Sequence, residues 1–174
     1  MSENKTQGEI LSKKLLYEQK SAWEYISDEE FKITFDLCER YKGFLNKAKT
    51  EREFTNETEK LARSKGFVSL DEVIKSNPKL LPGMKVYSVG RNKTIVLAVI
   101  GENSMESGVN IVGAHIDSPR IDLKPNPMYE ANDMVFLKTH YYGGIKKYQW
   151  VTIPLAMHGV IVKRDGSTVN VCIG

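Results

Sequence analysis

One short stretch of the sequence, VGAHIDSPRIDLK at residues 112–124, combines residue types suited to metal or acid–base chemistry. In an extended strand, residues two apart project to the same side, so His115 and Asp117 are expected to touch. A metal-binding imidazole commonly donates its other N–H to a carboxylate, which fixes the tautomer. The pair therefore indicates a metal ligand with its supporting carboxylate, or an Asp117 that acts directly as base or ligand. A buried histidine satisfied by a neighbouring aspartate at a strand end is an equally open interpretation.

The other candidates for chemistry have weaker patterns. His140 and His158 lack ligand-spaced partners and are expected to be surface or core histidines. Cys172 has the surroundings of a small buried hydrophobe. The YYGG run at residues 141–144 lacks the spacing of a phosphate loop and predicts a tight turn. The basic and aromatic residues at 146–150 allow a nucleic-acid surface, but a net charge of +3 gives that function no support.

Two apolar runs are expected to position the His115 motif. Residues 94–100 and 109–117 predict consecutive buried strands, the first entered through a hairpin turn at residues 90–93. Such strands belong in a sheet covered on both faces, which favours an α/β fold. Ligands of open α/β sheets lie at the carboxyl ends of the strands, which is where His115 falls.

The first 65 or so residues predict helices. Residues 9–26 and 31–48 have helical apolar spacing, and Ser27 is the expected N-cap of the second helix. A third helix is expected to start near Thr55 or Asn56 and to end at Gly66. A short fourth helix, capped by Ser69, must stop before Pro78.

Beyond Pro125 the sequence predicts short strands, with RDGS at residues 164–167 as a hairpin turn, and this stretch is interpreted as the start of a separate β-rich unit. The polar start lacks the apolar region of a signal peptide, and no apolar window has the length of a membrane span. The two cysteines form no CxxC pair, which favours a reducing compartment and a soluble cytoplasmic protein. The chain ends in a strand pattern, so we expect it to be the N-terminal portion of a longer protein.

The ordered series GAHIDSPRIDLKPNP, THYYGGIKKYQW and PLAMHGVIVK resembles the aspartyl aminopeptidase family of dinuclear zinc metallopeptidases, the relatives of vacuolar aminopeptidase I. The resemblance implies that residues 1–125 are the N-terminal part of an α/β zinc-peptidase catalytic domain. Residues 126–174 would begin an inserted β-rich dimerisation domain, and dimers would assemble into dodecamers. The implied activity is zinc-dependent removal of the N-terminal residue of peptides, with two Zn²⁺ ions in the complete active site and no nucleic-acid or membrane partner.

By position, the resemblance implies that His115 is a zinc ligand and Asp117 the catalytic-site aspartate that supports it. Tyr142, Gly143 and Gly144 match a turn near the start of the β-rich domain. Thr152 to Pro154 stand where many members carry an Asp-Arg pair, which favours a bacterial-type subgroup with a different substrate preference. The family's remaining ligands and general base lie farther along than residue 174. The alternative function is therefore a catalytically incomplete fragment that acts only in assembly or protein interaction.

Overall fold

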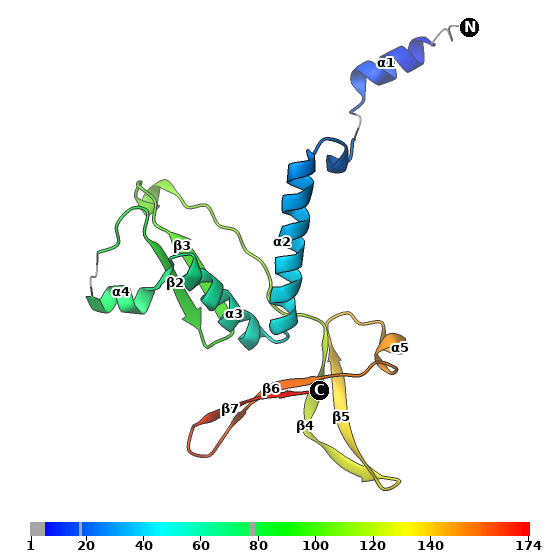
Figure 1. Cartoon of the computed structure of the whole chain (residues 1–174), viewed down its shortest axis with the longest axis vertical. Helices are drawn as coiled ribbons and strands as arrows, with labels where there is room; N and C mark the ends of the chain where they lie inside the picture. The colour runs from blue at the N-terminus through cyan, green and yellow to red at the C-terminus, as the bar shows by residue number, and fades with distance from the viewer. Residues whose placement is uncertain (1–5, 18, 77–78) are drawn as a thin grey trace. The chain divides into compact units, whose positions relative to one another are not determined.

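The computed structural model describes residues 6–17, 19–76 and 79–174 (Figure 1). The chain divides into two units, Met1–Gly43 and Phe44–Gly174. The first unit contains helix α1 (Gln7–Leu15), the 3-10 turn η1 (Ala22–Glu24) and most of helix α2 (Asp28–Lys47). The predicted start of α2 is confirmed, because the Ser27 hydroxyl accepts the Glu30 N–H and Glu30 accepts the Ser27 N–H in return.

The single helix predicted for residues 9–26 is wrong. Helix α1 ends at Leu15, and the described chain becomes helical again only in η1. The apolar residues that carried the prediction are largely uncovered: Leu15 and Leu16 are 73% and 70% exposed. Most helix stability in proteins comes from packing of an apolar face, and these leucines contribute little of it.

Helix α3 (Glu51–Ser64) lies in the second unit and starts four residues before the earlier of the two predicted positions, Thr55. Thr50 is the N-cap and forms a capping box with Glu53, so the competing Asn56–Glu59 pattern lies inside the helix. Gly66 ends α3 as predicted, with a φ of +83° that favours glycine. The start of α3 places Glu51 and Glu53 in its first turn, and both of these carboxylates contact the β hairpins described below.

A three-stranded sheet lies beside α3 (Figure 1). Strand β1 (Val68–Ser69) pairs in parallel with β2 (Lys85–Gly90), and β2 pairs antiparallel with β3 (Thr94–Val99). The predicted turn at residues 90–93 is confirmed, with Arg91 and Asn92 at positive φ. Helix α4 (Leu70–Ser76) ends before Pro78, which lies outside the described residues. The buried residues of the second unit gather around α3, α4 and β2: Ala48, Thr55, Ala62, Val73, Val86 and Tyr87.

The second predicted strand, residues 109–117, is wrong: the segment is irregular in the structure. Ile111 and Val112 are 83% and 99% exposed. A strand takes its backbone hydrogen bonds from neighbouring strands, and none of the described strands pairs with this segment. Its apolar composition alone therefore misled the prediction, whereas the α/β class itself is confirmed.

Two antiparallel hairpins follow. Strands β4 (Arg120–Ala131) and β5 (Met134–Tyr142) turn at Asn132 and Asp133, both at positive φ as a tight hairpin requires. The short helix α5 (Lys147–Trp150) leads to β6 (Met157–Val162) and β7 (Thr168–Ile173), which are joined through the predicted RDGS turn.

The division of the chain at residue 125 into a catalytic and a dimerisation domain stays a prediction. Within the described ranges, no helix is long and apolar enough to cross a membrane.

Candidate functional site

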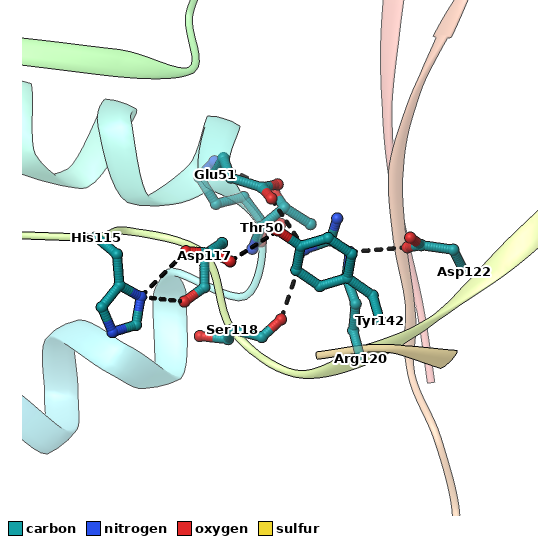
Figure 2. Close-up of polar contacts among 9 residues, drawn as sticks. Thr50, Glu51, His115, Asp117, Ser118, Arg120, Asp122 and Tyr142 are labelled. Carbon is teal, nitrogen blue, oxygen red and sulfur yellow. Dashed lines mark hydrogen bonds and ion pairs between the residues drawn. The ribbon is translucent and has the colours of Figure 1, made fainter. Parts of the chain in front are cut away.

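His115 and Asp117 lie in the irregular segment directly before β4, and their side chains are in contact as predicted (Figure 2). Nδ1 of His115 is 3.0 Å from Oδ1 of Asp117 and 3.0 Å from the backbone oxygen of the same residue. Both neighbours are hydrogen-bond acceptors, so Nδ1 carries the ring proton in the neutral imidazole. The Nε2 lone pair is left available, on a side chain that is 83% exposed.

Tyr142, at the end of β5, completes the surroundings of Asp117. Its hydroxyl donates to Oδ2 of Asp117 at 2.7 Å, so each carboxylate oxygen has a hydrogen-bond donor (Figure 2). The hydrogen bond from Tyr142, and next that from His115, hold the pKa of Asp117 below its usual range. The same contact raises the pKa of Tyr142. Asp117 is therefore an anion with both oxygens engaged, an arrangement better suited to supporting His115 than to accepting a proton from a substrate.

Arg120 packs against the ring of Tyr142, whose hydroxyl contacts Asp117. Its guanidinium lies 4.0 Å from the centre of the Tyr142 ring, a cation–π contact. Nη1 donates to Glu51 of α3 at 2.9 Å, and Nε donates to Asp122 at 2.7 Å. The planar fork of Arg120 thus links the first turn of α3 to the start of β4 and to Tyr142.

Sequence reasoning missed the roles of Tyr142, Arg120 and Glu51. The sequence predicts Tyr142 only as part of a turn. That turn is present: Gly143 has a φ of +73°, and a Cβ atom at this position would contact Pro119. Arg120 and Asp122 alternate along a strand, which is a local signal that the two side chains share a face. Glu51 is 69 residues from Arg120 in the sequence, so no local sequence pattern predicts that contact.

The remaining candidates have other surroundings. Nδ1 of the exposed His140 lies near the Tyr141 carbonyl, whereas Nδ1 of His158 lies 2.8 Å from Oε1 of Glu53. Cys172 is exposed, so the prediction of a buried thiol is wrong. Its strand β7 pairs with β6, and its sulfur lies 4.0 Å from Nε2 of His158. Lys147 lies over the ring of Tyr141, within the cluster considered for nucleic acid.

A complete metal site is not present in the described part of the chain, where no group of three or more histidine, cysteine, aspartate or glutamate side chains is arranged to hold an ion. A hydrolytic zinc site commonly takes three protein ligands and keeps one position open. Such a site would need ligands other than those at His115, Asp117 and their neighbours.

Comparison with known proteins gives the class of protein. Residues 44–172 match the family described as aminopeptidase I zinc metalloprotease (M18). This match covers most of the chain, and the chain therefore belongs to the M18 family, as the resemblance implied.

Individual relatives agree with this assignment. A probable M18 family aminopeptidase 1 of Clostridium acetobutylicum is 50% identical over 160 residues, which are 92% of this chain and 34% of the relative. The crystal structure of aminopeptidase I from Borrelia burgdorferi superimposes with a TM-score of 0.81 at 41% identity, covering 89% of this chain and 37% of that one. An M18 aminopeptidase structure from Thermotoga maritima gives a TM-score of 0.79 at 40% identity, with 91% and 33% covered. The chain spans about a third of the length of these relatives.

Proposed function

We propose that the protein is a zinc-dependent aminopeptidase that hydrolyses the N-terminal residue of peptides, and that this chain contributes the zinc ligand His115. The observation that carries the proposal is the fixed tautomer: Nδ1 of His115 faces two oxygens of Asp117, and Nε2 has no partner among the described residues. Family membership supports the activity. Two Zn²⁺ ions in the complete site, peptide substrates and a homo-oligomeric, cytoplasmic enzyme are parts of the same proposal.

The residues present fit a zinc ion in part. An imidazole that donates one N–H to a carboxylate and exposes its other nitrogen has the usual arrangement of a zinc-binding histidine. Only His115 meets this description among the residues of the motif, so the other ligands have to come from the rest of the polypeptide or from another chain. Bound zinc would polarise the scissile carbonyl and lower the pKa of a coordinated water.

Three residues of the chain hold the His115 imidazole in the orientation that a zinc ligand needs. Asp117 keeps the ring proton on Nδ1 and holds the imidazole plane through its side chain and its carbonyl oxygen. Tyr142 holds the second oxygen of Asp117, which restrains rotation of the carboxylate. Arg120 packs against the Tyr142 ring and is itself fixed by two carboxylates.

The alternative is a role in assembly alone. The single ligand of this chain and the exposed apolar residues Ile111 and Val112 favour it for these 174 residues taken by themselves. Measurements of zinc content and of peptide hydrolysis distinguish the aminopeptidase from a protein that acts only in assembly. The 174-residue chain alone is expected to hydrolyse no aminoacyl substrate, whereas the complete protein is expected to bind zinc and to be active.

The decisive variant is His115→Ala in the complete protein, with His140→Ala as the matched control on an exposed strand position. Zinc is quantified by mass spectrometry, and hydrolysis is followed with a panel of aminoacyl p-nitroanilides. We expect His115→Ala to lose zinc and nearly all activity, and the control to retain both. Full activity and full zinc content in His115→Ala would refute the assignment.

A further inference from the structure

Three side chains that the proposed zinc site does not use meet where α3 approaches the hairpin β6–β7: Glu53, His158 and Cys172. Oε1 of Glu53 is 2.8 Å from Nδ1 of His158. Nε2 of the same ring is 4.0 Å from Sγ of Cys172, within the range of a hydrogen bond to sulfur. The order carboxylate, imidazole, thiol is the order in which a nucleophilic cysteine is commonly activated.

The hairpin sets the distance between the ring and the thiol. His158 in β6 and Cys172 in β7 are directly opposite each other in the antiparallel register. Opposite residues on one face of such a pair have Cβ atoms about 4.5–5.5 Å apart, so their side chains stay neighbours as long as the hairpin is formed. The contact therefore depends on strand pairing rather than on a flexible loop.

Glu53 sets the orientation of the ring. Its Oε2 accepts the backbone N–H groups of Lys49 and Thr50, both at 3.0 Å, as part of the cap of α3. Burial opposes ionisation of Glu53, but the hydrogen bonds from His158 and from these two N–H groups outweigh it and keep its pKa below the usual range. An ionised Glu53 accepts the proton of Nδ1, so the lone pair of His158 faces the thiol.

The thiol is accessible to a reagent. Cys172 is exposed, although the imidazole beside it is only 18% exposed. A hollow of about 370 Å³ adjoins Glu53 and is lined by Val160, Thr168 and Asn170 of the same hairpin. By strand alternation these residues share a face with His158 and Cys172. A small molecule can therefore approach the sulfur from solvent.

We propose that Cys172 is a nucleophilic thiol, with His158 as its base and Glu53 as the residue that positions the base, and that soft electrophiles modify it selectively. With iodoacetamide as the probe, the sulfur forms a bond to the methylene carbon. The carbon–iodine bond breaks and iodide leaves with the bonding electron pair. The thiol proton passes to Nε2 of His158 and from there to water.

The chain carries its own reference thiol, Cys38, which is exposed on α2 in the first unit. Cys38→Ser leaves Cys172 to be followed alone, and Cys172→Ser leaves Cys38. At pH 7 we expect Cys172 to be alkylated about 3–10-fold faster than Cys38. The rate rises because His158 increases the share of reactive thiolate at Cys172. The increase stays moderate because a stabilised thiolate is somewhat less nucleophilic. Equal rates for the two thiols would overturn the proposal.

His158→Gln tests the base. We expect it to lower the alkylation rate of Cys172 to that of Cys38, while the rate of Cys38 in the same protein stays constant as the internal reference. Cross-strand nuclear Overhauser effects between β6 and β7 check that the hairpin is still formed in the variant. An unchanged fast rate at Cys172 would also overturn the proposal.

Glu53→Gln tests the positioning step, because glutamine retains the length of the capping side chain but loses the charge. The readout is the long-range ¹H–¹⁵N spectrum of His158, which shows which ring nitrogen carries the proton. We expect the Nδ1–H form in the unsubstituted chain and a mixture of tautomers in the variant. A ring protonated on Nε2 in the unsubstituted chain would contradict the mechanism.

Discussion

Removing the carboxylate of Asp117 is the perturbation that examines the proposed zinc ligand most directly. Oδ1 of Asp117 accepts from Nδ1 of His115, but so does the backbone oxygen of Asp117, at the same 3.0 Å. In Asp117→Ala the carbonyl therefore still holds the ring proton on Nδ1, and only the charge and one acceptor are lost. Removing such a supporting carboxylate typically weakens metal binding about 10–100-fold, and the retained carbonyl places our expectation near tenfold.

The assay is competition for zinc between the complete protein and a chromophoric chelator at pH 7. Asp117→Asn is expected to weaken binding less than Asp117→Ala, since the amide oxygen still accepts from His115. Tyr142→Phe is expected to have a smaller effect still, and none in the Asp117→Ala background, because the hydroxyl donates only to that carboxylate in the described structure. Asp36→Asn on α2 is the matched control. Zinc affinity of Asp117→Ala within twofold of the unsubstituted protein would refute the reasoning.

Two further predictions concern the stability of the second unit. The buried Tyr87 donates to Glu59 at 2.6 Å, so Tyr87→Phe is expected to lower the free energy of unfolding by about 1–2 kcal/mol in urea titrations. Burial, and next the hydrogen bond to Glu59, raises the pKa of Tyr87 to about 12 from 10.0, so its contribution is complete below pH 10 and is lost as pH rises toward 12. Absorbance titration should show one tyrosine ionising last, and its absence from Tyr87→Phe identifies it. Arg120→Lys is expected to destabilise the unit by about 1 kcal/mol, because an ammonium cannot reproduce the fork toward Glu51 and Asp122; an unchanged urea midpoint would contradict this.

The local parts of the fold and site followed from the sequence. The Ser27 cap, the turn at residues 90–93, the Gly66 helix end and the RDGS turn all depend on residues within a few positions of each other. The contact between His115 and Asp117 is of the same kind, since the two are two residues apart. Their roles at a zinc ion stay predictions.

What the sequence did not reveal depends on partners far along the chain. The start of α3 is an exception, because Thr50 and Glu53 form a local capping box that competes in the sequence with Asn56 and Glu59. The contacts of Glu51 with Arg120 and of Glu53 with His158 span 69 and 105 residues. Residues 109–117 have the composition of a buried strand, but strand formation requires a neighbour that composition does not specify.

The first turn of α3 contacts both β hairpins. Glu51 at its first position holds β4 through Arg120, and Glu53 at its third position holds β6 through His158. Helix ends normally fray at little cost and independently of their surroundings. Here fraying of one turn would break two distant contacts together: that of Glu51 with Arg120, which packs on Tyr142 beside the His115 motif, and that of Glu53 with His158.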